Sequence, residues 1–274
     1  MSVTIHLEHC SVRYTAAAPW ALSELSMSIP QGSCCAILGP TSAGKSTLLQ
    51  TLSGYLGKHH RSALSLGTFQ IGGVQYDGLP REILFPLVGL VMQDPFVMIS
   101  GIHETVYQEV AFTLSNIQRE PAAVSAQVEK TLASLKLSSL AQRPPPMLSG
   151  GEAQRVALAS ILVADPKILL LDEPRNALDC EGQENLARIL QSLRGKTTVL
   201  FSDYQIELAL AVADYVLVLN EGTSLFFGSR KDFLRERGRY KQILFSSEWT
   251  EVVDSSLLSS DQRFRHRFHK LGWL

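Results

Sequence analysis

The chain has 274 residues, which is enough for one large domain with a complete core or for a domain plus an appendage. The net charge of −1 argues against a nucleic-acid platform. The four cysteines have no metal-ligand spacing and do not suggest a disulfide framework, so a reducing cytosol fits best. No apolar stretch reaches the ~18–20 residues of a membrane span, and the N-terminal residues lack the pattern of a signal peptide.

The first third of the chain predicts strands around a glycine-rich turn. Residues 3–12 alternate apolar and polar side chains, as an edge or meander strand does. The apolar run 33–38 predicts a buried strand, and the spacing over residues 45–53 predicts a helix. Between residues 69 and 92, short strand-like pieces broken by glycines predict a small antiparallel β element beside the main sheet.

The remaining two thirds alternate between helical and strand-like segments. Residues 105–142 have helical spacing, with a new helix beginning at Pro121, and residues 151–164 form another helical segment. Apolar, β-favouring runs are found at residues 167–171, 197–201 and 215–219, and a helical segment separates the last two. This alternation predicts an α/β fold with a mainly parallel sheet and flanking helices.

Residues 39–47 fit the phosphate-binding pattern G-x-x-x-x-G-K-[ST] between the predicted strand and helix. Gly39 and Gly44 keep side chains away from the loop, so that backbone amides can face the oxygens of a triphosphate. Lys45 brings a positive charge to the β- and γ-phosphates, and the Ser46 hydroxyl can ligate Mg²⁺. The residues predicted to bind ATP here are Gly39, Pro40, Thr41, Ser42, Ala43, Gly44, Lys45, Ser46 and Thr47.

Two carboxylates follow the apolar run 168–171. Asp172, at the end of the predicted strand, can hold Mg²⁺ through water, and Glu173 can polarise an attacking water as a general base. Alone, a strand that ends in two acids is common. Together with the phosphate loop, the pair predicts ATP hydrolysis that depends on Mg²⁺.

The segment Leu148-Ser149-Gly150-Gly151-Glu152 resembles the signature motif of ABC ATPases, and it precedes Asp172 by the spacing that this family shows. Ser149 and the amides of Gly150 and Gly151 come before a predicted helix, which makes a second anion-binding helix start. The resemblance implies a P-loop NTPase core with an antiparallel β subdomain and a helical signature subdomain. It also implies a head-to-tail pair of such domains, hetero- or homodimeric, with ATP between one phosphate loop and the other signature.

Other positions match the same family in order. Tyr14 resembles the aromatic residue that stacks on adenine. Gln93 resembles the Q-loop glutamine, which touches Mg²⁺ and links the site to a transmembrane partner. Asp179 belongs to a segment that resembles the D-loop at the dimer interface, with Asn176 at the usual serine position. Tyr14, Gln93 and Asp179 join the predicted site, whose catalytic residues are Lys45, Gln93, Glu173 and Tyr204.

The resemblance covers about residues 3–230 and implies an organisation in two parts. We expect an ATP-binding domain over residues 1–230, with its helical subdomain at about 95–160, and a C-terminal helical extension over residues 231–274. The extension ends in a basic segment, 263–270, with Phe264, Phe268 and Leu271 on one helical face. That face could contact a membrane surface or a subunit, or it could belong to a docked terminal helix.

One departure from the family concerns the switch histidine that contacts the γ-phosphate. That position falls on Tyr204, which can donate a hydrogen bond but brings no positive charge near pH 7. Two hypotheses follow: this chain's own site hydrolyses ATP poorly, or Tyr204 replaces the histidine adequately. In the first case, a paralogous ATPase that carries the histidine would complete a heterodimer.

Residues 105–112 resemble the ATPases of energy-coupling-factor importers, which take up vitamins, cobalt or nickel. The resemblance implies a transmembrane coupling protein and a membrane substrate-binding protein as partners, no nucleic acid, and a peripheral location at the cytoplasmic face of the cell membrane. Alternatives are a subunit of another ABC importer, a soluble ABC ATPase of the iron–sulfur-assembly type, and a non-catalytic regulatory subunit.

Overall fold

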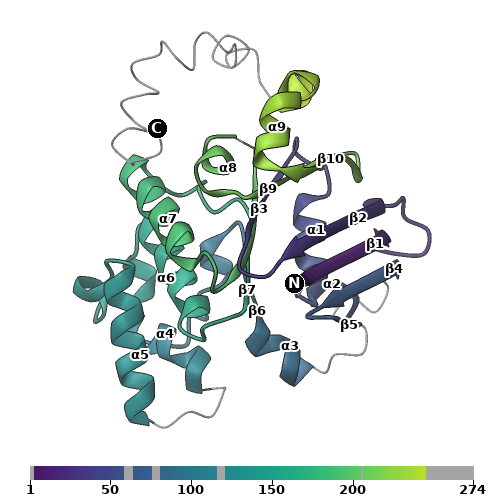
Figure 1. The fold of residues 1–274 in the computed structure, drawn as a ribbon. Coiled ribbons are helices and arrows are strands. Elements are labelled where there is room, and N and C mark those ends of the chain that lie inside the picture. Colours follow the sequence, from purple (N-terminus) through teal and green to yellow (C-terminus); the bar gives the residue numbers. More distant parts are fainter. Residues whose placement is uncertain (1–2, 59–63, 76–80, 116–120, 205, 245–274) are drawn as a thin grey trace, which may run out of the picture.

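The computed structural model describes residues 3–58, 64–75, 81–115, 121–204 and 206–244. Its central element is a six-stranded sheet (Figure 1). Five neighbouring strands of this sheet are parallel, and the sixth pairs antiparallel at one edge. In spatial order they are β10 (Thr223–Ser229), β9 (Tyr215–Asn220), β3 (Cys34–Leu38), β8 (Thr198–Asp203), β7 (Ile168–Leu171) and β6 (Val88–Val91).

A second, four-stranded sheet is antiparallel, with the order β2 (Leu22–Pro30), β1 (Val3–Arg13), β4 (Leu64–Ile71) and β5 (Val74–Gln75). The prediction that residues 69–92 form an antiparallel element was therefore only partly right. Within that range, α3 (Arg81–Leu87) is helical and β6 joins the parallel sheet. The short strand β6 lacks the alternation of a half-exposed strand, because both of its faces are covered, as is usual for parallel strands.

Helices cover both sides of the six-stranded sheet (Figure 1). The helices are α1 (Lys45–Leu52), α2 (Tyr55–Lys58), α3, α4 (Val106–Ser115), α5 (Pro121–Ser134), α6 (Gly150–Leu162), α7 (Cys180–Leu193), α8 (Ile206–Val212), α9 (Arg230–Glu236) and α10 (Lys241–Leu244). Short 3₁₀ segments are Pro95–Val97, Ser138–Leu140, Pro145–Met147 and Arg237–Tyr240. Within the described ranges, no helix is long and apolar enough to cross a lipid bilayer.

The two faces of the central sheet pack into two separate cores. Along β3, Cys34, Ala36 and Leu38 join the core shared with α4 to α8, whereas Cys35 and Ile37 join the core shared with α1 and the antiparallel sheet. Every residue of β3 and β7 is buried, because each face of these strands is covered. The strands that carry the site are therefore held from both sides.

The chain continues past β10 into the body of the protein. Phe233 in α9 is fully buried and Tyr240 nearly so, and both rings pack against Phe226 of β10. Burial raises the pKa of Tyr240. The predicted boundary at residue 230 and the helical subdomain at about 95–160 stay predictions. The basic segment 263–270 lies outside the described residues.

Candidate nucleotide-binding site

The predicted site residues gather at one edge of the parallel sheet. Register pairs Leu38 of β3 with Asp203 of β8, and Leu171 of β7 with Phe201 of β8. The carboxyl ends of β3, β8, β7 and β6 therefore lie side by side, in that order. Such an edge is where open parallel sheets bind ligands.

The phosphate loop follows β3 directly, and its backbone requires glycine at two positions. Gly39 has φ +155° and Gly44, the N-cap of α1, has φ +101°. A Cβ atom at Gly39 would lie 2.2 Å from the carbonyl oxygen of Leu219, and one at Gly44 would lie 2.7 Å from the carbonyl oxygen of Ala21. The loop therefore passes too close to neighbouring backbone for any side chain at either position.

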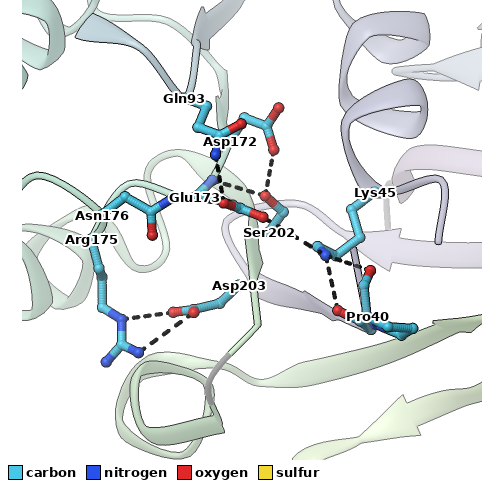
Figure 2. Close-up of polar contacts among 10 residues, drawn as sticks. Pro40, Lys45, Gln93, Asp172, Glu173, Arg175, Asn176, Ser202 and Asp203 are labelled. Atoms are coloured by element: carbon cyan, nitrogen blue, oxygen red, sulfur yellow. Dashed lines mark hydrogen bonds and ion pairs between the residues drawn. The ribbon is translucent and has the colours of Figure 1, made fainter. Parts of the chain in front are cut away.

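Lys45 lies in the first turn of α1 and is only 5% exposed. Its Nζ atom donates to the carbonyl oxygens of Gly39 at 2.8 Å and Pro40 at 2.9 Å, and it lies 3.8 Å from Oε1 of Glu173 (Figure 2). Burial lowers the pKa of Lys45, whereas the nearby carboxylates act in the opposite direction. The cation thus lies between the phosphate loop and the acidic side of the site.

The other residues of the loop have different environments. Ala43 is buried, while Thr41 and Ser42 are exposed, with Ser42 in the left-handed region at φ +65°. Ser46 is half-buried in the first turn of α1. Thr47 is buried, and its Oγ1 atom lies 3.0 Å from the hydroxyl of Tyr14, which is 41% exposed.

The acidic side of the site lies at the end of β7. Asp172 is buried, whereas Glu173 is half-buried and has φ +46°, which is uncommon for a residue with a side chain. Oε2 of Glu173 accepts hydrogen bonds from Nε2 of Gln93 at 2.8 Å and from Nδ2 of Asn176 at 2.6 Å. The structure therefore brings Lys45, Gln93, Asp172 and Glu173 together, as Figure 2 shows.

Sequence reasoning missed Ser202, the next-to-last residue of β8. Its hydroxyl donates to Oδ1 of Asp172 at 2.6 Å and accepts from the amide of Glu173 at 2.8 Å. A signal for this contact exists in the sequence. Ser202 directly follows a predicted strand, and parallel neighbouring strands end at the same edge of a sheet.

The signature segment opens α6 with a complete capping box. The hydroxyl of Ser149 accepts from the amide of Glu152 at 3.3 Å, and Oε2 of Glu152 accepts from the amide of Ser149 at 2.8 Å. This hydrogen bond from the Ser149 backbone is the main cause that lowers the pKa of Glu152, and the nearby Arg143 contributes. Two reciprocal hydrogen bonds therefore hold the helix start, which has a negative charge in its first turn.

Tight packing joins the signature segment to the D-loop. Leu148 is buried, and a Cβ atom at Gly150 or Gly151 would lie 3.7 Å from Cβ or 3.2 Å from the carbonyl oxygen of Ala177. Asp179 caps α7, because its Oδ1 atom accepts from the amide of Gly182 at 2.8 Å. The signature and the D-loop thus form one surface beside Glu173.

The oxygen donors near the phosphate loop fit Mg²⁺. Among the described residues, no three His, Cys, Asp or Glu side chains gather as a protein-only metal cage. The Asp172 carboxylate, the Ser46 hydroxyl and the Gln93 amide are the residues that would hold the ion, which usually keeps water and phosphate ligands as well. When bound, Mg²⁺ would neutralise part of the phosphate charge.

Comparison with known proteins identifies the family. The sequence profile described as "ABC transporter" matches residues 22–176. The cobalt import ATP-binding protein CbiO of Rhodobacter capsulatus is 40% identical over 226 residues, which cover 81% of this chain and 78% of that protein. The chain belongs to the ABC transporter family.

Two further similarities agree with this assignment. The energy-coupling factor transporter ATP-binding protein EcfA2 of Methanospirillum hungatei is 37% identical over 86% of this chain, and the match spans 58% of that protein. The structure of cbiO1 from Clostridium perfringens, described as part of the ABC transporter complex cbiONQ, has a TM-score of 0.74 at 28% identity. That match covers 88% of this chain and 94% of the solved chain.

The family membership confirms the predicted α/β fold, a P-loop NTPase core of the ABC ATPase type, and the predicted resemblance to energy-coupling-factor ATPases. As an ABC ATPase, the protein binds and hydrolyses ATP. Tyr204 follows β8 directly, at the carboxyl edge of the sheet, and is 51% exposed.

Proposed function

We propose that this ABC ATPase drives an importer of the energy-coupling-factor type, which takes up vitamins or transition-metal ions. ATP binding would close a dimer of ATPase subunits, and hydrolysis would reopen it. The observation that carries the proposal is that Glu173 lies close to Lys45 and accepts a hydrogen bond from Gln93. Gln93 also begins a surface segment that is suited to contact with a partner.

Within the site, each side chain has a proposed role. Lys45 and the amides of residues 39–47 bind the β- and γ-phosphates, Asp172 and Ser46 hold Mg²⁺, and Glu173 orients and polarises the attacking water. The hydrogen bond from Gln93 to Glu173 ties the water-activating carboxylate to the segment that follows β6. A shift of that segment would therefore move the carboxylate.

The segment after Gln93 is anchored to α4 by a buried carboxylate. Glu109 is 4% exposed and accepts two hydrogen bonds of 2.7 Å from Ser100, one from its amide and one from its hydroxyl. Glu109 belongs to the stretch 105–112 that resembles energy-coupling-factor ATPases. The anchored segment exposes Phe96, Val97 and Ile102, which are 50%, 68% and 76% accessible. Large exposed apolar side chains suit contact with another protein.

A cavity next to this segment supports the proposal that a partner protein contacts the same face. It measures about 240 Å³ and lies between α3, β6, α4 and α6, with lining residues that include Phe85, Met92, Thr113 and Ile161. We propose that a transmembrane coupling protein contacts this face and that a membrane substrate-binding protein completes the complex. The chain would then work as a peripheral protein at the cytoplasmic face of the membrane.

The signature and the D-loop support a paired arrangement. Ser149 and the following amides begin α6 on a surface beside Asp179, and they form a phosphate-binding helix start that a second subunit's ATP could reach. Tyr14 would stack on the adenine. The second subunit is either another copy of this chain or a paralogue, and Tyr204 favours the paralogue.

Reconstitution tests this function. The chain is combined in liposomes with its candidate coupling and substrate-binding proteins, and both ATP turnover and uptake of labelled cobalt, nickel or vitamin are measured. Glu173→Gln should reduce turnover by on the order of 10²–10³ or more while ATP still binds. Glu181→Gln is the matched control, because this exposed carboxylate pairs only with Lys136 among the ion pairs found. Uptake by the wild-type complex that does not depend on ATP would contradict the proposal, whereas ATP-dependent uptake that persists in Glu173→Gln would show that a paralogue's site is sufficient.

A further inference from the structure

The last two residues of β8 contact both ends of the turn that follows β7, residues 172–175. Ser202 is fully buried and Asp203 is 2% exposed. Ser202 binds Asp172 and the amide of Glu173, while Asp203 binds Arg175 through an ion pair of 2.8 Å (Figure 2). Glu173, which has its backbone at φ +46°, thus lies between two buried anchors.

The Ser202 hydroxyl uses its donor and an acceptor site at the same time. It donates a short hydrogen bond of 2.6 Å to the Asp172 carboxylate, and it accepts a hydrogen bond of 2.8 Å from the amide of Glu173. One oxygen atom therefore sets the distance between the Asp172 side chain and the Glu173 backbone. Neither link involves exposed atoms of Ser202, so water does not readily replace it.

We propose that Ser202 is a positioning residue for ATP hydrolysis. Its hydroxyl orients the Asp172 carboxylate toward the metal position and holds the Glu173 backbone in the left-handed conformation that aims its carboxylate at Lys45 and Gln93. This inference rests on the proposed function, in which Asp172 holds Mg²⁺ and Glu173 activates water. Positioning within a fraction of an ångström matters because a small misplacement of a reacting group has a large effect on rate.

Thr198 provides a matched control on the same strand. It is also fully buried, and its hydroxyl accepts from the amide of Gly32 at 3.0 Å, at the opposite end of β8 from the site. Thr198→Val and Ser202→Ala each remove one buried hydroxyl from β8. A role of Ser202 in stability alone would make the two variants behave alike at the site.

Amide hydrogen exchange, resolved by residue, tests the contact without any nucleotide. In Ser202→Ala, the amide of Glu173 should exchange at least about tenfold faster, because it loses its partner. The amide of Asp172 is the internal reference, since it bonds to the carbonyl of Val91 at 2.9 Å and not to Ser202. Thr198→Val should leave the Glu173 amide unchanged. Ser202→Cys, which keeps the shape but offers only a weak donor, should change exchange in the same direction as alanine.

Turnover and magnesium dependence test the consequence in the full complex. Ser202→Ala should lower kcat by about 10- to 100-fold and raise the Mg²⁺ concentration needed for half-maximal binding of a fluorescent ATP analogue. Thr198→Val should change neither. Wild-type exchange at Glu173, or wild-type kcat and Mg²⁺ dependence in Ser202→Ala, would overturn the proposal if Glu173→Gln is inactive. If Glu173→Gln keeps full turnover, either the assignment of the base fails or a paralogue's site is sufficient, and the exchange rates alone decide the role of Ser202.

Discussion

The phosphate loop and the acidic side of the site are constructed in opposite ways. The loop consists of consecutive residues, 39–47, and its shape depends on glycine backbone that passes close to Leu219 and Ala21. The acidic side draws Gln93, Glu173 and Ser202 from the ends of three strands, and hydrogen bonds between side chains and backbone hold it together. The phosphate loop is therefore sensitive to added side-chain atoms, and the acidic side is sensitive to the loss of hydrogen-bond or ion-pair partners.

The largest expected effect comes from a lost partner on the acidic side. Asp203→Ala removes the ion-pair partner of Arg175, which is 9% exposed and also lies 3.6 Å from Glu207. Leaving a buried guanidinium with less compensation should lower the free energy of unfolding by about 3–5 kcal/mol. Urea denaturation measures the loss. The control Glu181→Ala breaks an exposed pair and should cost less than about 1 kcal/mol. Equal losses in the two variants would contradict the comparison.

An added atom in the loop should affect nucleotide binding next. Gly39→Ala places a methyl group 2.2 Å from a backbone oxygen, so the loop must move and its amides lose their alignment. We expect ATP affinity to fall by roughly 100-fold, or about 2.7 kcal/mol. Gly72→Ala is the control, because Gly72 also has positive φ but no atom near the added Cβ. Calorimetric titration with ATP measures both variants, and wild-type affinity in Gly39→Ala would refute the steric argument.

A substitution at Tyr204, which follows the strand between the phosphate loop and the acidic side, should have a smaller effect on activity. If this chain's own site is weak, Tyr204→His should raise turnover of the purified chain about tenfold or more, because histidine is a donor that can also bring positive charge to the γ-phosphate. Adding Glu173→Gln to this variant should abolish the gain, which shows that the chain's own site produced it. Steady-state phosphate release measures the rates. Unchanged turnover with histidine would mean that Tyr204 already performs the positioning role.

The smallest expected effect concerns the capping box of the signature helix. The lowered pKa of Glu152 means that its charge stabilises the folded state at pH values above the ordinary glutamate range. That contribution is lost as the pH falls through the lowered pKa. Glu152→Gln should therefore destabilise the protein by about 0.5–1 kcal/mol at pH 7 and by less at about pH 3. Urea unfolding at both pH values checks this, and a difference that grows toward acid pH would contradict the sign.

The positions of the acidic side could be predicted in part. Asp172 and Glu173 were predicted as a pair because they follow an apolar strand, and Gln93 was predicted through the family resemblance. Ser202 and the Arg175–Asp203 ion pair were not predicted: the position of Ser202 after a predicted strand is only a weak signal, and an ion pair between distant residues has no local pattern. The short strand-like pieces in residues 69–92 also did not reveal that β6 joins the parallel sheet, since a short apolar run suits a parallel or an antiparallel sheet.

The sequence by itself determined what is contiguous: the phosphate loop, the signature with its capping box, the strand that ends in two acids, and the α/β alternation. Each depends on neighbours within a few residues, so its physical requirements appear as a local pattern. Only the tertiary structure decided which strand ends meet, because the order β3, β8, β7, β6 is set by packing on both faces of the sheet. That order places the Ser202 hydroxyl against Asp172 and Glu173, 29 or 30 residues away along the chain.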